Sequence, residues 1–409
     1  MPTSSRQKMK LAKYTFLALA AMLLAACTND DTDLEWLIDN NPGKVVPPVI
    51  EMDYSDLDEG PDVIVTDPSD DTYNDYWENS PWTTTVRVNY TAEGATVTGT
   101  STRVKAAIDG GHVTLTISSS RVHVIASGEC QDGSLKVYSD YKYRLTLNGL
   151  TLTNPAGPAI NNQCGKTLYL IVAQGTANKL QDGADYAYVE EEDMKGTIFS
   201  EGQVIFSGQG ELEVASISHN AIASDDYLRF RKGCKYKLTS EKGNCLRGKD
   251  AVYIDGSVFN MMTRGDAKKG ITSRGPVTIK GGRATIITSG APVVDVELSD
   301  TTSSAGVKSD SIMTIAGGEL RILSHGEGGK GINAHQGIVM TGGKVTIVTQ
   351  GAKGLASPKG IKCEGELAVT AGALYSYSKH ARPIDATTLN LAPAHKVYET
   401  KTHLFHIEY

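Results

Sequence analysis

A repeat of about 24 residues is the feature that most restricts how this chain can fold. An apolar anchor residue recurs along the chain, and a second apolar residue stands eight positions after each anchor. Consecutive anchors are 24 or 25 residues apart at four of the seven steps, and the longer steps leave room for inserted loops. The anchors are Ile160, Ile198, Ile222, Leu246, Ile271, Val307, Ile332 and Ile361.

Each repeat has the pattern of short strands separated by turns. Apolar residues alternate with other residues, as at Val345 and Ile347, and glycine pairs such as Gly342-Gly343 follow the second apolar position. A unit of this size cannot bury its apolar side alone, and stacking on the next unit solves that problem. Blades of β-propellers repeat at about 40 residues or more, so a propeller is excluded.

The sequence therefore predicts an all-β chain that forms one right-handed parallel β-helix. We expect the regular turns of the helix over residues 159–392. Residues 82–158 are expected to form an N-terminal cap and the first turns, and residues 393–409 a C-terminal tail.

The N-terminus has the pattern of a secretory signal. Basic residues over 6–13 precede an apolar stretch over 14–26, which at 13 residues is too short to span a bilayer. The stretch ends in Leu24-Ala25-Ala26-Cys27, which resembles the lipobox of bacterial lipoproteins. This implies a signal peptide over 1–26 and a diacylated Cys27 that anchors the chain to a membrane. Residues 28–33 (TNDDTD) resemble the acidic tag that directs Bacteroides-type lipoproteins to the cell surface, so we expect a surface-exposed outer-membrane lipoprotein.

The charge is unevenly distributed along the chain. Residues 28–80 carry sixteen acidic residues against one basic residue, together with five prolines. This composition predicts a disordered acidic tether over 27–81. Residues 81–409 are mildly basic, whereas the whole chain has a net charge of −7, which argues against a nucleic-acid partner. We expect a monomer.

Several short motifs in order resemble a known family. Residues 148–154 (NGLTLTN), 157–160 (GPAI) and 175–183 (GTANKLQDG) are similar to the first turns of a bacterial carbohydrate-binding β-helix family. Residues 306–310 (GVKSD) fit its later repeats, and the resemblance covers about 82–390. It implies a solenoid like that of pectate lyases, binding of polygalacturonate as in clostridial members, and bound calcium.

One column of the repeat departs from this family. The position two before the anchor is usually Asp there, and no repeat of this chain has Asp at that position. Four late repeats carry a cation instead: Lys269, Lys330, Lys359 and Arg382. In-register cations repel one another, so this row predicts a binding edge for an acidic, uronate-containing polysaccharide. The alternative is that these side chains extend separately into water at little cost.

The missing Asp column weakens the calcium inference without removing it. Carboxylate oxygens are suitable calcium ligands, and acidic residues occur in neighbouring repeats. The candidate metal residues are Asp225, Asp226, Asp250 and Asp310.

The sequence thus predicts a non-catalytic carbohydrate-binding surface lipoprotein whose partners are an acidic polysaccharide and, through the lipid, the membrane. A calcium-dependent pectate-type lyase is the first alternative, since such enzymes use a Lys or Arg base beside a calcium ion. An adhesin or structural surface protein is the second alternative. No zinc-type histidine spacing, phosphate-binding loop or Gly-x-Ser-x-Gly motif is present.

Overall fold

The computed structural model describes residues 46–296, 300–393, 396–400 and 403–409. The predicted signal peptide over 1–26 and the predicted lipidation residue Cys27 lie outside these ranges. Within them, no helix is long and apolar enough to cross a membrane.

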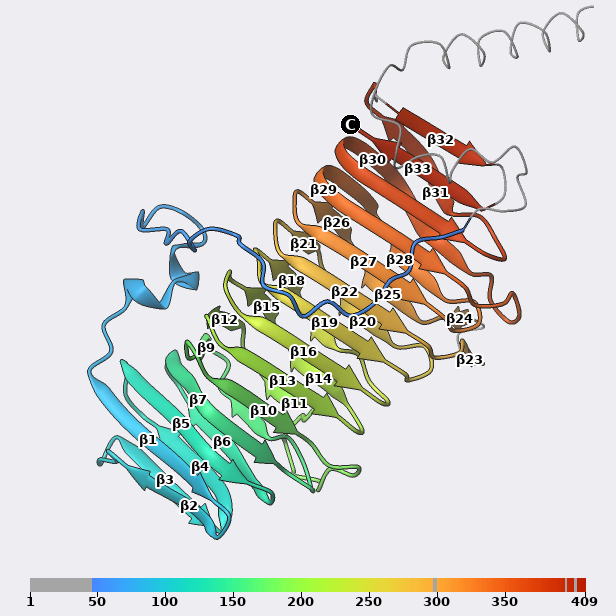
Figure 1. Cartoon of the computed structure of the whole chain (residues 1–409). Coiled ribbons are helices and arrows are strands. Elements are labelled where there is room, and N and C mark those ends of the chain that lie inside the picture. The colour runs from blue at the N-terminus through green and yellow to red at the C-terminus, as the bar shows by residue number, and fades with distance from the viewer. Residues whose placement is uncertain (1–45, 297–299, 394–395, 401–402) are drawn as a thin grey trace, which may run out of the picture. The chain divides into compact units, whose positions relative to one another are not determined.

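Successive turns of the chain stack as a parallel β-helix with three strands per turn (Figure 1). Each strand pairs in parallel with its counterparts one turn earlier and one turn later. Sheet 1 contains β8 (Ile160–Gln163), β11 (Gly196–Ser200), β14 (Asn220–Ser224), β17 (Leu246–Gly248), β20 (Lys269–Ser273), β25 (Ala305–Ser309), β28 (Lys330–Ala334) and the start of β30 (Lys359–Ser378).

Sheets 2 and 3 complete each turn. Sheet 2 contains β9 (Leu168–Val172), β12 (Val204–Gly208), β15 (Tyr227–Phe230), β18 (Ala251–Ile254), β21 (Val277–Ile279), β26 (Ile312–Ile315) and the start of β29 (Gly337–Thr349). Sheet 3 contains β10 (Ala177–Gln181), β13 (Glu211–Ser216), β16 (Lys235–Ser240), β19 (Val258–Thr263), β22 (Arg283–Thr288), β27 (Glu319–Ser324) and the end of β29. The predicted all-β, parallel β-helical fold is confirmed.

The anchors of the repeat occupy one column of sheet 1, in register from turn to turn. Ile222 pairs with Leu246, Leu246 with Ile271, and the column continues to Ile361. Every anchor is buried. Because side chains of a strand alternate between faces, the residue after each anchor points outward.

Glycine makes the turn between sheets 2 and 3 possible. Gly282, Gly318, Gly343 and Gly372 have positive φ values of 76–89°. A Cβ on Gly318 would lie 2.6 Å from the carbonyl oxygen of Gly281, one turn below. These residues must be glycine because both the backbone conformation and the close stacking exclude a side chain.

Additional strands close both ends of the helix. The N-terminal end comprises β1 (Thr84–Thr91), β2 (Gly94–Thr98), β3 (Val104–Asp109), β4 (Gly111–Ile117), β5 (Val122–Cys130), β6 (Gly133–Ser139) and β7 (Tyr143–Thr153), with antiparallel β1–β2 and β3–β4 pairs. At the other end are β31 (Ile384–Leu391), β32 (Lys396–Thr400) and β33 (Leu404–Glu408). β33 pairs antiparallel with β30, so the expected C-terminal tail is part of the sheet and covers its edge. The loop inserted between β22 and β25 carries a hairpin of β23 (Val293–Asp295) and β24 (Asp300–Thr302).

Residues 48–82, which we call the strap, run along the outside of the helix across successive turns (Figure 1). The strap contains two short 3-10 helices, η2 (Tyr73–Asp75) and η3 (Trp77–Asn79). Near its start, Ile50 is buried in a small apolar cluster with Leu323 and Val348.

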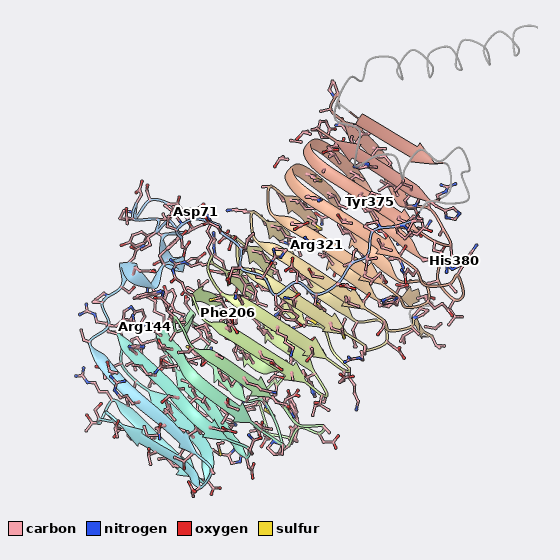
Figure 2. All side chains as sticks on the ribbon, in the orientation of Figure 1. Asp71, Arg144, Phe206, Arg321, Tyr375 and His380 are labelled. Carbon is pink, nitrogen blue, oxygen red and sulfur yellow. The ribbon has the colours of Figure 1, made fainter. Side chains whose placement is uncertain are left out.

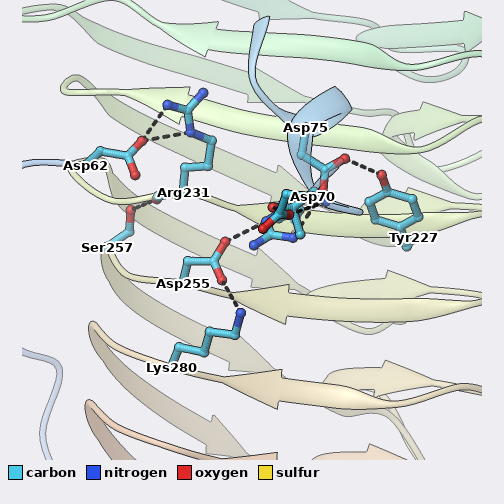
Figure 3. A network of polar contacts seen from close by, with 10 residues as sticks. Asp62, Asp70, Asp75, Tyr227, Arg231, Asp255, Ser257 and Lys280 are labelled. Atoms are coloured by element: carbon cyan, nitrogen blue, oxygen red, sulfur yellow. Dashed lines mark hydrogen bonds and ion pairs between the residues drawn. The ribbon is translucent and has the colours of Figure 1, made fainter. Parts of the chain in front are cut away.

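The acidic side chains of the strap pair with arginines that project from the helix. Asp75 accepts hydrogen bonds from Arg229 Nη1 at 3.0 Å and from the Tyr227 hydroxyl at 2.6 Å (Figure 3). Arg231 forms ion pairs with Asp62 at 2.7 Å and Glu78 at 2.9 Å. The prediction of a disordered tether over 27–81 is therefore wrong for the strap, because its carboxylates neutralise cations that the fold places beneath them.

Candidate functional site

A basic pocket of about 250 Å³ lies on the outer face of sheet 1. Five cationic side chains and one carboxylate line it: Arg247, Lys268, Lys269, Arg274, Lys308 and Asp310. The remaining lining residues are small or polar: Asn244, Ala267, Thr272 and Ser273. The excess of cations suits an anionic ligand.

Strand register places two of these cations. Arg247 and Lys308 each follow an anchor and so point outward, and Thr272 stands between them in the same ladder. They are therefore two strand spacings apart, roughly 10 Å along the helix axis. The ladder continues through Asn333 to Lys362.

Arg247 and Lys308 each contact a carboxylate. Arg247 Nη1 donates to Asp225 Oδ1 at 2.9 Å, and Lys195 donates to the other oxygen. Burial alone would raise the pKa of Asp225, but the hydrogen bonds from Lys195 and Arg247 outweigh it and hold the pKa below its usual value. Lys308 Nζ lies 2.9 Å from Asp310 Oδ1. The two carboxylates thus fix where the cations stand.

Two lysines of the predicted row are buried: Lys269, which lines the pocket, and Lys330, which stands two turns further along the same ladder and is not among the lining residues. Lys269 is 8% exposed and Lys330 is 9% exposed. Lys269 Nζ donates to the carbonyl of Ala267 at 2.5 Å, and Lys330 Nζ donates to Ser303 Oγ at 2.8 Å. Among the residues that the structure describes, neither amine forms an ion pair with an acid.

Burial explains the unusual acidity of both amines. It lowers the pKa of Lys269 to about 7, with the charges of Lys308, Lys268 and Lys330 adding to the effect. It lowers the pKa of Lys330 to about 8, helped by Lys362 and Lys359. Burial thus moves the titration of Lys269 from the alkaline range into the neutral range.

The predicted basic row is partly assembled. Lys269, Lys330 and Lys359 share one ladder, with Ala305 between the first two. The expected exposed strip is not formed, because Lys269 and Lys330 are buried and Lys359 pairs with Asp385 at 2.9 Å.

The fourth member of the row, Arg382, is exposed and lies outside the paired strands. That these four residues bind a ligand stays a prediction.

The four predicted calcium residues do not converge. Asp225 and Asp310 are held by cations, whereas Asp226 accepts a hydrogen bond from the Tyr227 backbone N–H at 2.8 Å. Burial, with the neighbouring charge of Asp250, raises the pKa of Asp226. In the described ranges no three acidic, histidine or cysteine side chains are grouped so as to hold a metal ion. The residues present do not fit a calcium site in this arrangement, and calcium binding stays a prediction.

Sequence reasoning missed Arg247 and Lys308. The predicted row stands two positions before each anchor, whereas these two residues stand one position after an anchor. Strand alternation would have identified this column as the outward one.

The fold and this outer face define a β-helical protein with a polar, cationic pocket on one sheet. The family model of carbohydrate-binding domain-containing proteins matches residues 109–269 and 266–354, which is more than half of the chain. The chain therefore belongs to the carbohydrate-binding domain-containing family.

A solved structure described as the polysaccharide lyase-like protein from C. thermocellum, gadolinium derivative, is also similar. It is 16% identical, with a TM-score of 0.45, over 75% of this chain and 97% of that chain. No curated protein matches the sequence.

Proposed function

We propose that this protein is a non-catalytic surface lipoprotein that binds the carboxylates of an acidic, uronate-containing polysaccharide in the basic pocket. The observation that carries the proposal is the lining of the pocket by five cations and a single carboxylate, in a chain of a carbohydrate-binding family. A uronate polymer repeats its carboxylates along its length, and the outward cations repeat along the helix axis. Affinity then comes from several weak contacts made together.

Removing the two outward cations tests the proposal. The double variant Arg247→Gln/Lys308→Gln is expected to bind polygalacturonate about 5- to 30-fold more weakly, since each partly exposed contact contributes up to about 1 kcal/mol. Affinity gel electrophoresis at two salt concentrations measures the change. Binding should also weaken with salt, which screens exposed charges.

A variant of equal charge serves as the control. Lys105 and Lys353 are exposed and lie outside the pocket, so Lys105→Gln/Lys353→Gln removes the same charge elsewhere. Equal loss in both variants would mean a general charge effect and contradict the proposal. Repeating the gels with a chelator tests calcium. Loss of binding on chelation would mean that a metal ion bridges the protein and the polysaccharide, in place of direct contacts with the cationic side chains.

The lipid anchor has its own test. Only a thiol accepts the diacylglycerol, so Cys27→Ser is expected to abolish incorporation of labelled fatty acid and to release the chain from the membrane fraction. The support for this part is the N-terminal sequence, with its basic, apolar and Leu24-Ala25-Ala26-Cys27 segments. Incorporation of label into the serine variant would contradict it.

A polysaccharide lyase is the second candidate, and Lys269 favours it. An amine with a pKa of about 7 can accept the proton next to a uronate carboxylate, and Lys269 lines the pocket beside Arg247. Incubation with polygalacturonate separates the two functions. A lyase produces unsaturated, ultraviolet-absorbing ends, and a binding protein leaves the polymer intact.

A further inference from the structure

A second cavity, which we call the strap pocket, lies on sheet 3 and has a volume of about 310 Å³. Tyr54 of the strap and Thr151 of β7 line part of it, and residues of β10, β13, β16 and β19 line the rest. It is distinct from the basic pocket, because the two share no lining residue and belong to different sheets.

Charged side chains of alternating sign line the strap pocket on sheet 3. Lys179, Glu213 and Lys237 follow one another in register on three successive turns. The Glu213 carboxylate lies between the two amines, 3.7 Å from Lys179 Nζ and 3.3 Å from Lys237 Nζ. The three side chains therefore present hydrogen-bond donors and an acceptor side by side.

A neighbouring column of charged side chains, with Lys235 and Glu211, also lines the pocket. Lys235 Nζ lies 2.6 Å from Asp56 and 3.4 Å from Glu211, and both Lys235 and Glu211 line the pocket. Counting Asp56, three lysines face three carboxylates, so the strap pocket has no net charge. Such a site favours neither an anionic nor a cationic ligand.

The backbone on either side of Tyr54 is fixed. Asn260 Oδ1 accepts from the backbone N–H of Asp53, and Asn260 Nδ2 donates to its carbonyl, both at 2.8 Å. The Asp53 carboxylate lies 3.2 Å from both Arg283 and Arg321. On the other side, the carbonyl of Ser55 accepts a hydrogen bond from Arg283.

Tyr54 nevertheless remains 56% exposed as a residue. An aromatic ring on an anchored segment, open to solvent at the mouth of a pocket, loses little conformational freedom when it contacts a ligand. Its amphipathic character suits a ligand with one apolar face and polar edges.

We propose that the strap pocket binds an uncharged pyranose unit of a polysaccharide, with the Tyr54 ring against the C–H face of the sugar. The hydroxyls of the sugar both donate and accept, and Lys179, Glu213 and Lys237 supply both kinds of partner. The cavity lies at the small end of the range for ligand sites, about 300–1,000 Å³, which suits one or two sugar rings. This inference does not depend on the basic pocket.

Saturation-transfer NMR of the full-length chain with neutral oligosaccharides tests the proposal. The probes are fragments of glucan, mannan, galactan and xylan. We expect at least one to receive saturation from the protein, a loss of at least about tenfold in affinity for Tyr54→Ala, and near-normal binding for Tyr54→Phe, which keeps the ring.

Two further variants make the result specific. Tyr188→Ala removes an exposed tyrosine outside the pocket and should bind as the parent does. Arg247→Gln/Lys308→Gln should also bind neutral sugars normally, which separates this proposal from that of the basic pocket. The proposal is overturned if no neutral probe binds, if Tyr54→Ala binds unchanged, or if the basic-pocket variant loses neutral binding to the same extent.

Discussion

Replacing Asp75 with Asn and Glu78 with Gln is expected to lower the free energy of unfolding by about 3–5 kcal/mol, as when one partner of a buried ion pair is removed. Arg231 is only 3% exposed at its side chain, and Arg229 is similarly covered. Arg229 keeps Asp255 and Arg231 keeps Asp62, but each buried guanidinium loses the charge of its second carboxylate partner. Denaturant unfolding followed by circular dichroism measures the loss.

Exposed acids of the same segment provide the control. Glu51 and Asp71 are exposed strap residues, and Figure 2 places Asp71 on the part of the strap that projects from the sheets. Glu51→Gln/Asp71→Asn removes the same charge and should change the free energy of unfolding by no more than about 0.5 kcal/mol. If both double variants unfold alike, the strap contributes only charge and its contacts with Arg229 and Arg231 contribute little.

The affinity for polygalacturonate is expected to fall on the order of 50-fold between about pH 6 and about pH 9. An anion binds the protonated amine, and the pKa values of Lys269, in the pocket, and of Lys330, two turns further along the same ladder, are lowered to about 7 and about 8. Binding is therefore strongest below pH 7, where both amines are charged, and weakens as the pH rises through both values. Uronate carboxylates stay ionised over this range. Calorimetry in buffers of different ionisation enthalpy measures the proton uptake directly.

The variant Lys269→Met/Lys330→Met isolates these two amines. It should bind more weakly at low pH and lose most of the pH dependence, whereas a profile as steep as that of the parent would contradict the assignment. The same shifts make the parent fold more stable as the pH rises from about 7 towards 10, because the unfolded chain binds protons that the folded chain lacks. The methionine variant should show less of this increase.

The fold was predictable because its signal is local and repeated. Ile222, Leu246 and Ile271 stand in register in the structure as their spacing predicted. A period of 24 residues reports only contacts between neighbouring turns, and those contacts make up most of a solenoid.

The candidate site was only partly predictable. Lys269 and Asp310 line the basic pocket, but repeat positions alone could not show that Lys269 is buried and that Asp310 is engaged by Lys308. The strap was missed for a different reason. Its order comes from pairs such as Asp53 with Arg321, which are far apart in sequence and follow no period.

The strap also changes how the turns depend on one another. Turns of a solenoid normally contact only their neighbours, so their stabilities add nearly independently and an end can fray alone. Here one segment reaches Arg144 near the first turns through Trp77, Arg229 in the middle, and Arg321 and Val348 near the last turns. Loss of any one turn therefore weakens the docking of the segment that spans the others, and the array should melt as a single cooperative unit.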